Sequence, residues 1–158
     1  YKRQARERVR IMTPYFRPDR ELIAGLIGAA LRGVRVDLIL PEENNQPLAH
    51  WAARNTIWQI IEQGVRVYYQ PPPFTHTKLW IVDSEFSLLG SANLDPRSLR
   101  LNFEFNLELH SRPLAADLSE HFDEVLASSR EVTLREVDGR PMLHRVRDAL
   151  AWLFSPYL

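Results

Sequence analysis

Apolar side chains in the first half of the chain recur with two different periods that alternate along the sequence. Three short runs rich in valine, isoleucine and leucine predict buried strands at residues 9–12, 34–40 and 65–69. Between these runs, apolar residues three and four apart predict helices at residues 19–32, with Asp19 as N-cap, and at residues 47–63. Each helix stops at a glycine, Gly33 or Gly64. This strand–helix–strand–helix–strand order favours a layered α/β domain.

The second half of the chain changes to a period of two. Residues 76–82 and 86–90 predict the strands of a hairpin around a tight turn at 83–85. Residues 103–109 alternate phenylalanine and leucine with polar residues, as a half-buried strand does. Two helices are predicted to follow, at residues 114–129 and 143–154. The expected fold class is therefore α/β, with a mixed and mostly parallel central sheet that helices cover on both faces.

Size and charge limit the domain organisation and the partners of the chain. Its 158 residues suit one domain with its own core, spanning residues 1–158. The 20 Lys and Arg residues balance the 20 Asp and Glu residues, which counts against a nucleic-acid partner because phosphate binding favours a basic excess. There is no cysteine, so disulfides and thiolate chemistry are excluded. No apolar run reaches the roughly 18 residues of a spanning helix, and the start at Tyr1 suggests a fragment of a longer protein.

The residues best suited to chemistry lie at the start of the predicted hairpin. Because side chains alternate in a strand, His76 and Lys78 should project from one face, about 7 Å apart along the backbone. The imidazole can attack phosphorus or shuttle a proton near neutral pH. The ammonium can hold a phosphoryl oxygen as a point charge. Asp83 has the opposite parity and lies at the strand end, so we expect its carboxylate to tie down the turn.

Further polar residues follow the returning strand of the hairpin. Gly90 leaves room for the close approach of another backbone segment. Ser91 and Asn93 are two apart and could face the same pocket as neutral hydrogen-bond donors. Glu104 lies on the polar face of the next predicted strand, where a carboxylate could orient an imidazole and stabilise its charged form. Glu108 shares that face, so either carboxylate could instead be a solvated surface charge.

Taken in order, these residues resemble the HKD motif of the phospholipase D superfamily without departure: His76-x-Lys78-x4-Asp83-x6-Gly90-Ser91-x-Asn93. Members of that superfamily bring two such motifs together; one histidine becomes a phosphohistidine, and the other acts as general acid and then base. The single motif here implies half an active site, with no metal and no cofactor. The site residues that the resemblance implies are the catalytic His76, Lys78 and Asp83, the phosphate-binding Lys78, Ser91 and Asn93, and the orienting carboxylate Glu104.

Segments on both sides of the motif resemble the second half of bacterial cardiolipin synthases. They are residues 13–16, 18–19, 40–45, 67–74, 93–98, 101–104 and 152–158. The resemblance covers nearly the whole chain and implies a phospholipase D-like layered domain. It also implies a second HKD domain as partner, in the same chain or in a homodimer, and a phospholipid substrate. The expected location is the bacterial cytoplasmic membrane, reached peripherally or through a missing N-terminal part.

The reaction that this resemblance implies is phosphatidyl transfer. A histidine attacks the phosphodiester of one phosphatidylglycerol, glycerol departs, and the headgroup hydroxyl of a second phosphatidylglycerol attacks the phosphohistidine to give cardiolipin. In the family the histidine of the first half is often the nucleophile, which would make His76 the acid and base. Three alternatives stay open: a homodimeric nuclease or phosphodiesterase with the same chemistry, a hydrolytic phospholipase D, and a half-domain that is inactive alone.

Several other residues have plainer interpretations. Four further histidines lack such partners and are expected at the surface or in satisfied contacts: His50, His110, His121 and His144. Arg97 and Arg100 are equally compatible with binding of anionic lipid and with salt bridges in a loop. Trp51 and Trp58, seven residues apart, are expected to pack in the core. Residues 71–74 and the tail at 152–154 could touch a bilayer, but packing onto the domain is the expected use, since no large amphipathic face is evident.

Overall fold

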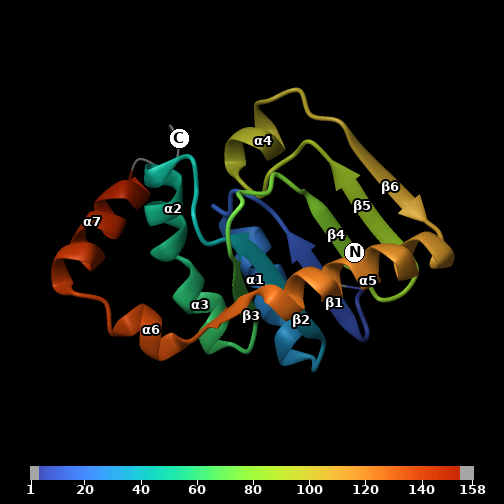
Figure 1. Cartoon of the computed structure of the whole chain (residues 1–158), viewed down its shortest axis with the longest axis horizontal. Coiled ribbons are helices and arrows are strands. Elements are labelled where there is room, and N and C mark those ends of the chain that lie inside the picture. The colour runs from blue at the N-terminus through green and yellow to red at the C-terminus, as the bar shows by residue number, and fades with distance from the viewer. Residues whose placement is uncertain (1–3, 154–158) are drawn as a thin grey trace.

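A computed structural model describes residues 4–153 and shows one mixed sheet of seven strands, in the order β6-β5-β4-β1-β2-β3-β7 (Figure 1). The strands are β1 (Arg8–Met12), β2 (Arg35–Pro41), β3 (Arg66–Gln70), β4 (Leu79–Val82), β5 (Phe86–Gly90), β6 (Asn106–His110) and β7 (Arg130–Val132). The helices are α1 (Arg20–Leu31), α2 (Pro47–Arg54), α3 (Ile57–Glu62), α4 (Pro96–Arg100), α5 (Arg112–Ser128), α6 (Leu134–Asp138) and α7 (Met142–Leu153). The mixed α/β fold that the sequence predicts is confirmed.

The strand directions correct one part of that prediction, because the sheet is not mostly parallel. Only the β1–β2 and β2–β3 pairs are parallel, and the other four pairs of the described sheet are antiparallel. The helices α1 and α2–α3 supply the long crossovers that parallel neighbours need, whereas the short turn between β4 and β5 can join only antiparallel strands. The centre is therefore a parallel trio, and antiparallel strands extend it on both sides.

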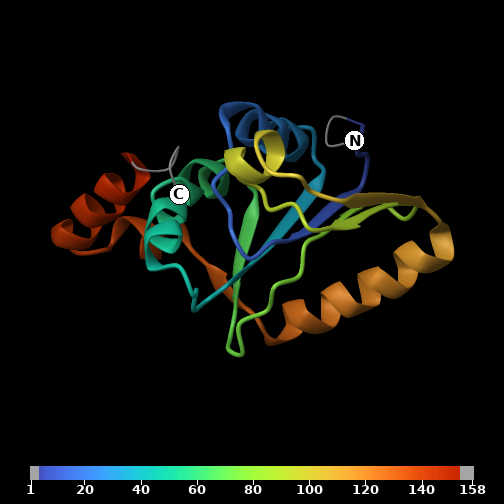
Figure 2. The same cartoon turned by 90° about the horizontal axis from the view of Figure 1, so that it is seen from above.

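Helices cover both faces of the sheet, as predicted, and each face has its own apolar core. Figure 2 shows α1 and α3 on one side of the sheet and α5 alone on the other. Neighbouring residues of one strand divide between the two cores: Leu38 packs with the α1 and α3 side chains, and Ile39 packs with Phe122 of α5. Both are buried, which explains why β2 reads as a continuous apolar run rather than an alternating one.

Some element boundaries differ from the prediction for local reasons. The helix expected at 47–63 is divided into α2 and α3, because the Thr56 hydroxyl donates to the carbonyls of Ala52 and Ala53 and competes with the helical backbone. Trp58, expected in the core, is exposed as a result of this change. The short elements α4, β7 and α6 were not predicted. The helix predicted to end at residue 154 is described to Leu153, and residue 154 lies outside the described residues.

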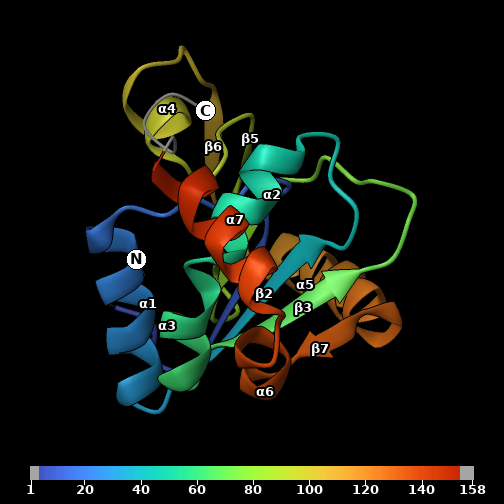
Figure 3. The same ribbon diagram turned by 90° about the vertical axis from the view of Figure 1, so that its left-hand side faces the viewer.

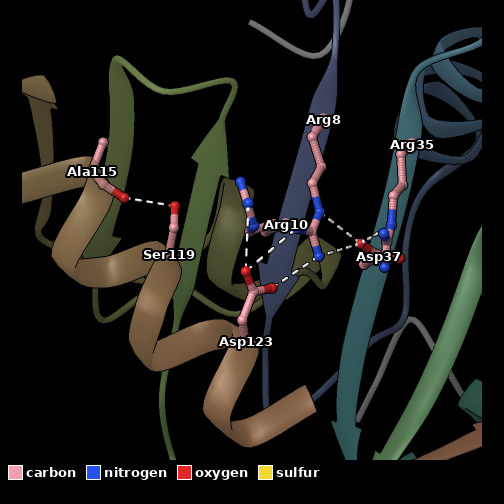
Figure 4. Close-up of polar contacts among 7 residues, drawn as sticks. All are labelled: Arg8, Arg10, Arg35, Asp37, Ala115, Ser119 and Asp123. Carbon is pink, nitrogen blue, oxygen red and sulfur yellow. Dashed lines mark hydrogen bonds and ion pairs between the residues drawn. The ribbon is translucent and has the colours of Figure 1, made fainter. Parts of the chain in front are cut away.

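An ionic cluster holds α5 against the central strands (Figure 4). Asp37 of β2 is completely buried and accepts hydrogen bonds from Arg8 at 2.9 Å and Arg35 at 2.8 Å. Arg8 also reaches Asp123 of α5 at 2.9 Å, and Arg10 lies 3.7 Å from the same carboxylate. Asp37 is the buried member of the cluster, whereas Asp123 is 46% exposed, so Arg8 links a buried carboxylate of β2 to a half-exposed carboxylate of α5.

A second carboxylate, Asp83, joins the end of β4 to the start of β1. Its side chain accepts the backbone N–H groups of Arg6 at 3.1 Å, Glu7 at 2.9 Å and Arg8 at 3.0 Å. Its own N–H donates to the Arg8 carbonyl at 2.8 Å. Partial burial would raise the pKa of Asp83, but the three amide donors outweigh it, so the pKa lies below its ordinary value.

These contacts predict that Asp83→Asn acts through stability. The residue has a φ of 53°, which asparagine tolerates, so the substitution removes charge with little backbone strain. Because the folded-state pKa is lowered, the carboxylate stabilises the fold above its unfolded pKa of about 4, and that contribution is lost as pH falls through the folded value. We expect a loss of about 1–2 kcal/mol at pH 7 that shrinks below about pH 4, measured by urea unfolding across pH.

Asp117→Asn, at an exposed position of α5, is the matched control and should leave stability unchanged within about 0.5 kcal/mol. Loss of catalytic activity in Asp83→Asn with an unchanged melting temperature would contradict the structural role.

Candidate active site

His76 and Lys78 meet just before β4 begins. The Lys78 Nζ atom lies 2.9 Å from His76 Nδ1, 3.3 Å from His76 Nε2 and 3.1 Å from the His76 carbonyl. The predicted strand over 76–82 starts only at Leu79, so these two residues belong to the entering loop. The predicted parity still holds for Leu79 and Ile81, which are buried with the α5 side chains. The imidazole and the ammonium therefore form one exposed unit at the mouth of the strand.

Two aromatic rings, those of Tyr15 and Phe74, contact the His76 ring. The ring of Tyr15 lies 5.9 Å from the His76 ring and the ring of Phe74 also lies 5.9 Å from it, with 6.3 Å between the two aromatic rings. The Tyr15 hydroxyl pairs with Asn45 Oδ1 at 2.5 Å, and Asn44 Nδ2 donates to the Pro14 carbonyl at 2.8 Å. The segments after β1 and β2 are thus tied together beside the imidazole.

Tyr15 and Asn45 are not among the site residues predicted from the sequence. A signal for them did exist, because each follows the carboxyl end of a parallel strand, β1 or β2. In open α/β sheets, ligands bind outside the carboxyl ends of the parallel strands. The order of the motif carries no information about these two residues, since they precede it by 30 residues or more.

Ser91 and Glu104 form a second polar unit beside the site. The Ser91 hydroxyl donates to one carboxylate oxygen of Glu104, and Asn102 Nδ2 donates to the other at 3.3 Å. The Ser91 hydroxyl also accepts the Phe105 N–H at 2.9 Å. Glu104 precedes β6 instead of lying within it, and in the described part of the chain it is Ser91 and Asn102 that donate to its carboxylate. Its predicted hydrogen bond to an imidazole is not formed here.

Asn93 faces a buried network below Lys78. Its Nδ2 donates to the Ser98 hydroxyl at 3.3 Å, whereas its Oδ1 is buried without a hydrogen-bond partner in the described structure. Asp95 is buried, caps α4 through the Ser98 N–H at 2.8 Å, and lies 3.8 Å from Arg17. Ser91 and Asn93 therefore hydrogen-bond to different neighbours, Glu104 and Ser98, and their shared pocket stays a prediction.

Gly90 allows the strand pair beside the site to close. An added Cβ would overlap the Asn106 side chain and the Phe105 carbonyl, so only glycine fits, as predicted. A small pocket of about 30 Å³ lies at this point, lined by residues that include Lys78, Gly90 and Ala92. It is large enough for a water molecule but not for a phospholipid headgroup. His76 and Lys78 instead lie where β1 ends and β4 begins. This side of the sheet, where His76 is exposed, is hereafter the open edge.

The electrostatics of the site favour a neutral imidazole next to a cation. Partial burial and the charge of Lys78 both lower the pKa of His76 from its ordinary value. Burial also lowers the pKa of Lys78, while Glu104 and Asp95 act in the opposite direction. The hydrogen bond from Ser91 lowers the pKa of Glu104, which keeps that carboxylate ionised. An uncharged ring nitrogen with an adjacent ammonium suits attack on, or proton transfer at, a phosphate group.

The structure does not bring the remaining candidate residues to this edge. Asp83 lies at the opposite end of β4, on the amides described above. Arg100 pairs with Asp19 at 3.0 Å, which fits the salt-bridge interpretation, whereas Arg97 is exposed. His50 contacts Tyr69 and His110 contacts Phe86; the other two histidines, His121 and His144, are exposed on α5 and α7.

No group of three or more His, Cys, Asp or Glu side chains in residues 4–153 is arranged to hold a metal ion. No helix in that range is both long and apolar enough to span a bilayer.

Comparisons with known proteins place this site in a family. Residues 3–126 match the family described as cardiolipin synthase, PLD-like domain. Cardiolipin synthase A of Serratia proteamaculans (strain 568) is 40% identical and that of Escherichia coli O157:H7 (strain EC4115 / EHEC) is 41% identical, each over 154 residues. Both alignments cover 98% of this chain and 32% of the relative, so the chain spans about a third of the length of these relatives.

Solved structures share the fold. Nuc, a phospholipase D family member from Salmonella typhimurium, superposes with a TM-score of 0.73 at 25% identity and covers 84% of this chain and 86% of its own. Phosphatidylserine synthase of Haemophilus influenzae Rd KW20 superposes with a TM-score of 0.78 at 19% identity, over 98% of this chain and 42% of its own. At 19% identity, the likeness to the phosphatidylserine synthase concerns the fold alone.

The site predicts that His76 titrates below pH 6.5 and that Lys78 contributes to this shift. Lys78→Met removes the neighbouring cation and should raise the pKa of His76, though not fully to its ordinary value, because burial is the larger cause. Imidazole ¹H–¹⁵N NMR spectra recorded from pH 4 to 9 measure both values.

Arg97→Met removes an exposed cation of α4 and serves as the control. A wild-type pKa at or above 6.5, or an equal shift in both variants, would show that Lys78 does not hold the imidazole neutral.

Proposed function

The chain belongs to the cardiolipin synthase family of phospholipase D-like domains, and we propose that it supplies one of two HKD half-sites in a phosphatidyltransferase. The enzyme would form cardiolipin from two phosphatidylglycerol molecules and release glycerol. The observation that carries this proposal is the contact of the His76 imidazole with the Lys78 ammonium at 2.9 Å, in the loop before β4, where His76 is exposed. Identity of about 40% to curated cardiolipin synthases across nearly the whole chain supports the choice of substrate.

The transfer proceeds in two displacements. An imidazole nitrogen attacks phosphorus of the first phosphatidylglycerol, a P–N bond forms, and the P–O bond to the glycerol headgroup breaks. The imidazole of the other motif gives the departing glycerol oxygen a proton. The same imidazole then takes the proton of a headgroup hydroxyl on the second phosphatidylglycerol, whose oxygen attacks phosphorus while the P–N bond breaks. Two moderate barriers thus replace one high barrier, and His76 fills one of these two roles.

The other polar residues support the phosphate and the imidazole in this scheme. Lys78 neutralises the oxygens of the phosphoryl group as charge builds up on them. Ser91 and Asn93 are neutral donors at the same edge, and substrate binding would have to release them from Glu104 and Ser98. Glu104 is ionised and close enough to influence Lys78, so its carboxylate can stabilise a cationic site. Asp83 serves the site through the fold.

A second HKD domain would cover the open edge. Phe103 and Phe105 flank Glu104 and are 108% and 70% exposed, although the sequence pattern predicted a half-buried strand. They lie at the β6 edge of the sheet, where the described helices leave them uncovered. Leu101 extends this exposed apolar strip. Burying Leu101, Phe103 and Phe105 against a partner domain would bring the second histidine to His76, either within one longer chain or in a homodimer.

A nuclease of the same superfamily is the second candidate, because the chemistry at phosphorus would be identical. The balance of 20 basic and 20 acidic residues argues against nucleic acid as substrate. The alignments with cardiolipin synthase A extend over 154 residues, whereas the family match ends at residue 126. The similarity to cardiolipin synthases therefore includes the last part of the chain, which supports a lipid substrate. A lipid substrate also places the enzyme at the bacterial cytoplasmic membrane.

The proposal predicts that His76→Ala in the complete enzyme lowers cardiolipin formation by about 10²–10⁴-fold, because general acid–base or nucleophilic catalysis is lost. Lys78→Ala should be comparably severe, since the phosphoryl oxygens lose a fixed cation. The measurement is lipid product analysis on vesicles of phosphatidylglycerol, with cardiolipin and free glycerol quantified together.

The control is His121→Ala, at an exposed histidine of α5. A loss below tenfold in His76→Ala would refute the assignment. Phosphatidic acid without cardiolipin would indicate a hydrolytic phospholipase D, and no lipid turnover by the wild type would direct the search to DNA and RNA.

If the second HKD domain lies in the same longer chain, the 158-residue chain alone turns over no lipid and adding that domain restores activity, whereas a homodimer would be active without it. Replacing Phe103 and Phe105 by serine should weaken this complementation by at least about tenfold, because two exposed aromatic rings no longer anchor the interface. Titration of one part against the other, with activity as readout, measures the effect. Undiminished complementation by the double variant would place the interface elsewhere.

A further inference from the structure

Helix α7 is fixed on one side and open on the other. Asp148 is completely buried and accepts hydrogen bonds from Arg147 at 2.7 Å and from Arg140, whose guanidinium also donates to the Arg54 carbonyl at 3.2 Å. The Arg147 guanidinium lies 4.3 Å from the centre of the Trp51 ring. These contacts attach α7 to α2 and to the end of α6, so its orientation is set by a buried charge.

The outer side of α7 is an apolar stripe. Leu143, Val146, Leu150 and Leu153 recur three and four residues apart, which places them on one face of the helix. All four are exposed, Leu143 by 81% and Leu150 by 53%. Residues 152–154 are predicted from the sequence to pack onto the domain. Helix α7 does pack against α2, but its last two residues, Trp152 and Leu153, are 46% and 62% exposed, and residue 154 lies outside the described residues.

A groove of about 340 Å³ runs between this stripe and α2. Its lining is almost entirely apolar and comes from both helices: Leu48, Trp51, Leu143, Val146, Leu150 and Ala151, with the Arg147 side chain. In Figures 1, 2 and 3, α7 is the outermost element at its end of the molecule, with α2 between it and the sheet. The groove and stripe together form an exposed apolar surface, hereafter the α2–α7 surface.

The charge of the α2–α7 surface is positive in a chain without net charge. Among the 20 residues of α2 and α7, the charged ones are three arginines, Arg54, Arg145 and Arg147, and one aspartate, Asp148. That aspartate is buried and already paired with two arginines. Arg145 is exposed and Arg54 is half-buried, whereas Arg147 contacts Asp148 and Trp51. The two helices present no exposed carboxylate next to the row of leucines. Apolar side chains flanked by arginine are typical of helices that lie in the interface of an anionic membrane.

Helix α2 connects this surface to the catalytic edge. Its buried Ala49 and Ala53 line a small cavity together with Tyr15, whose ring contacts His76. Asn45, just before α2, holds the Tyr15 hydroxyl. In Figure 1, α2 begins and α7 ends on the upper side of the molecule, where α4 and the segment leading to β6 also lie. A bilayer lying along this side would contact both the α2–α7 surface and the open edge.

We propose that the α2–α7 surface docks the chain on a membrane that carries anionic lipid, with the leucines of α7 inserted and the exposed Arg145 on the headgroups. The inference rests on the proposed function, in which the substrate itself is a bilayer lipid. A second HKD domain is the less suitable occupant. The exposed phenylalanines proposed to meet that domain lie just before β6, which is at the opposite end of the molecule from α7 (Figures 1 and 2).

The test is flotation of the chain with vesicles. We expect binding to equimolar phosphatidylglycerol and phosphatidylcholine, little binding to phosphatidylcholine alone, and weaker binding at high salt. The double variant Leu143→Ser and Leu150→Ser should bind at least about tenfold more weakly, since two leucines no longer leave water. Arg145→Glu should weaken binding to anionic vesicles and reduce the salt dependence.

Leu31→Ser is the matched control, because Leu31 is 69% exposed on α1, away from the surface. It should bind vesicles as the wild type does, and all variants should melt at the wild-type temperature. Equal binding of the double variant and the wild type would overturn the proposal, as would equal binding to charged and uncharged vesicles. So would a wild-type oligomer that the double variant dissociates, since a second copy would then occupy the surface.

Flotation needs no turnover, which separates this proposal from the proposed function. Vesicle binding lost in the double variant, in an enzyme that makes no cardiolipin, would support docking and refute the transferase. Cardiolipin synthesis together with unchanged vesicle binding by the double variant would support the transferase and refute docking through this surface. The same substitutions in the complete enzyme extend the test to the intact protein.

Discussion

The position of β1 in the sheet is the constraint on which the rest of the structure depends. The strand is parallel to β2 on one side and antiparallel to β4 on the other, with Met12 opposite Leu79. This register places the segment after Met12 beside the segment before Leu79, so Tyr15 meets His76. Asp83 fixes the opposite end of the pair through the amides at the start of β1. The site is therefore assembled by strand pairing, and the carboxylate at one end of β4 supports the imidazole at the other.

Local signals in the sequence were sufficient for most of the elements but not for their arrangement. The two glycine stops and the Val-Arg-Val runs locate α1, β2 and β3, because they report backbone conformation directly. Strand direction depends on which partner β4 finds across the sheet, and periodicity contains no such information; the expected mostly parallel sheet was wrong for this reason. The apolar alternation at 103–109 was also misleading, because the same pattern serves a buried face and an exposed edge.

In the candidate site, too, some residues are predictable from local sequence and others depend on the folded sheet. Spacing alone identified His76 and Lys78, since two residues apart on an extended chain must stay close whatever the fold. Glu104 was identified from its position after the hairpin, but its observed donors are Ser91 and Asn102 instead of an imidazole. Asp95 and Tyr15 reach the site from loops that only the folded sheet brings together. Long-range electrostatic neighbours of this kind have no counterpart in a linear motif.

One half-site alone leaves the proposed catalytic histidine in contact with water. Charge on a transferring phosphoryl group is stabilised far more by a fixed ammonium when water is excluded, yet His76 is exposed here. Exclusion of water therefore requires covering surfaces, and the chain has exposed apolar surfaces beside β6 and on α7, at opposite ends of the molecule (Figures 1 and 2). A partner domain on the first and a bilayer against the second would close the edge from two directions. The lipid phosphate would then approach along the side where α2 begins, past Tyr15, with the ammonium of Lys78 next to the imidazole that it meets.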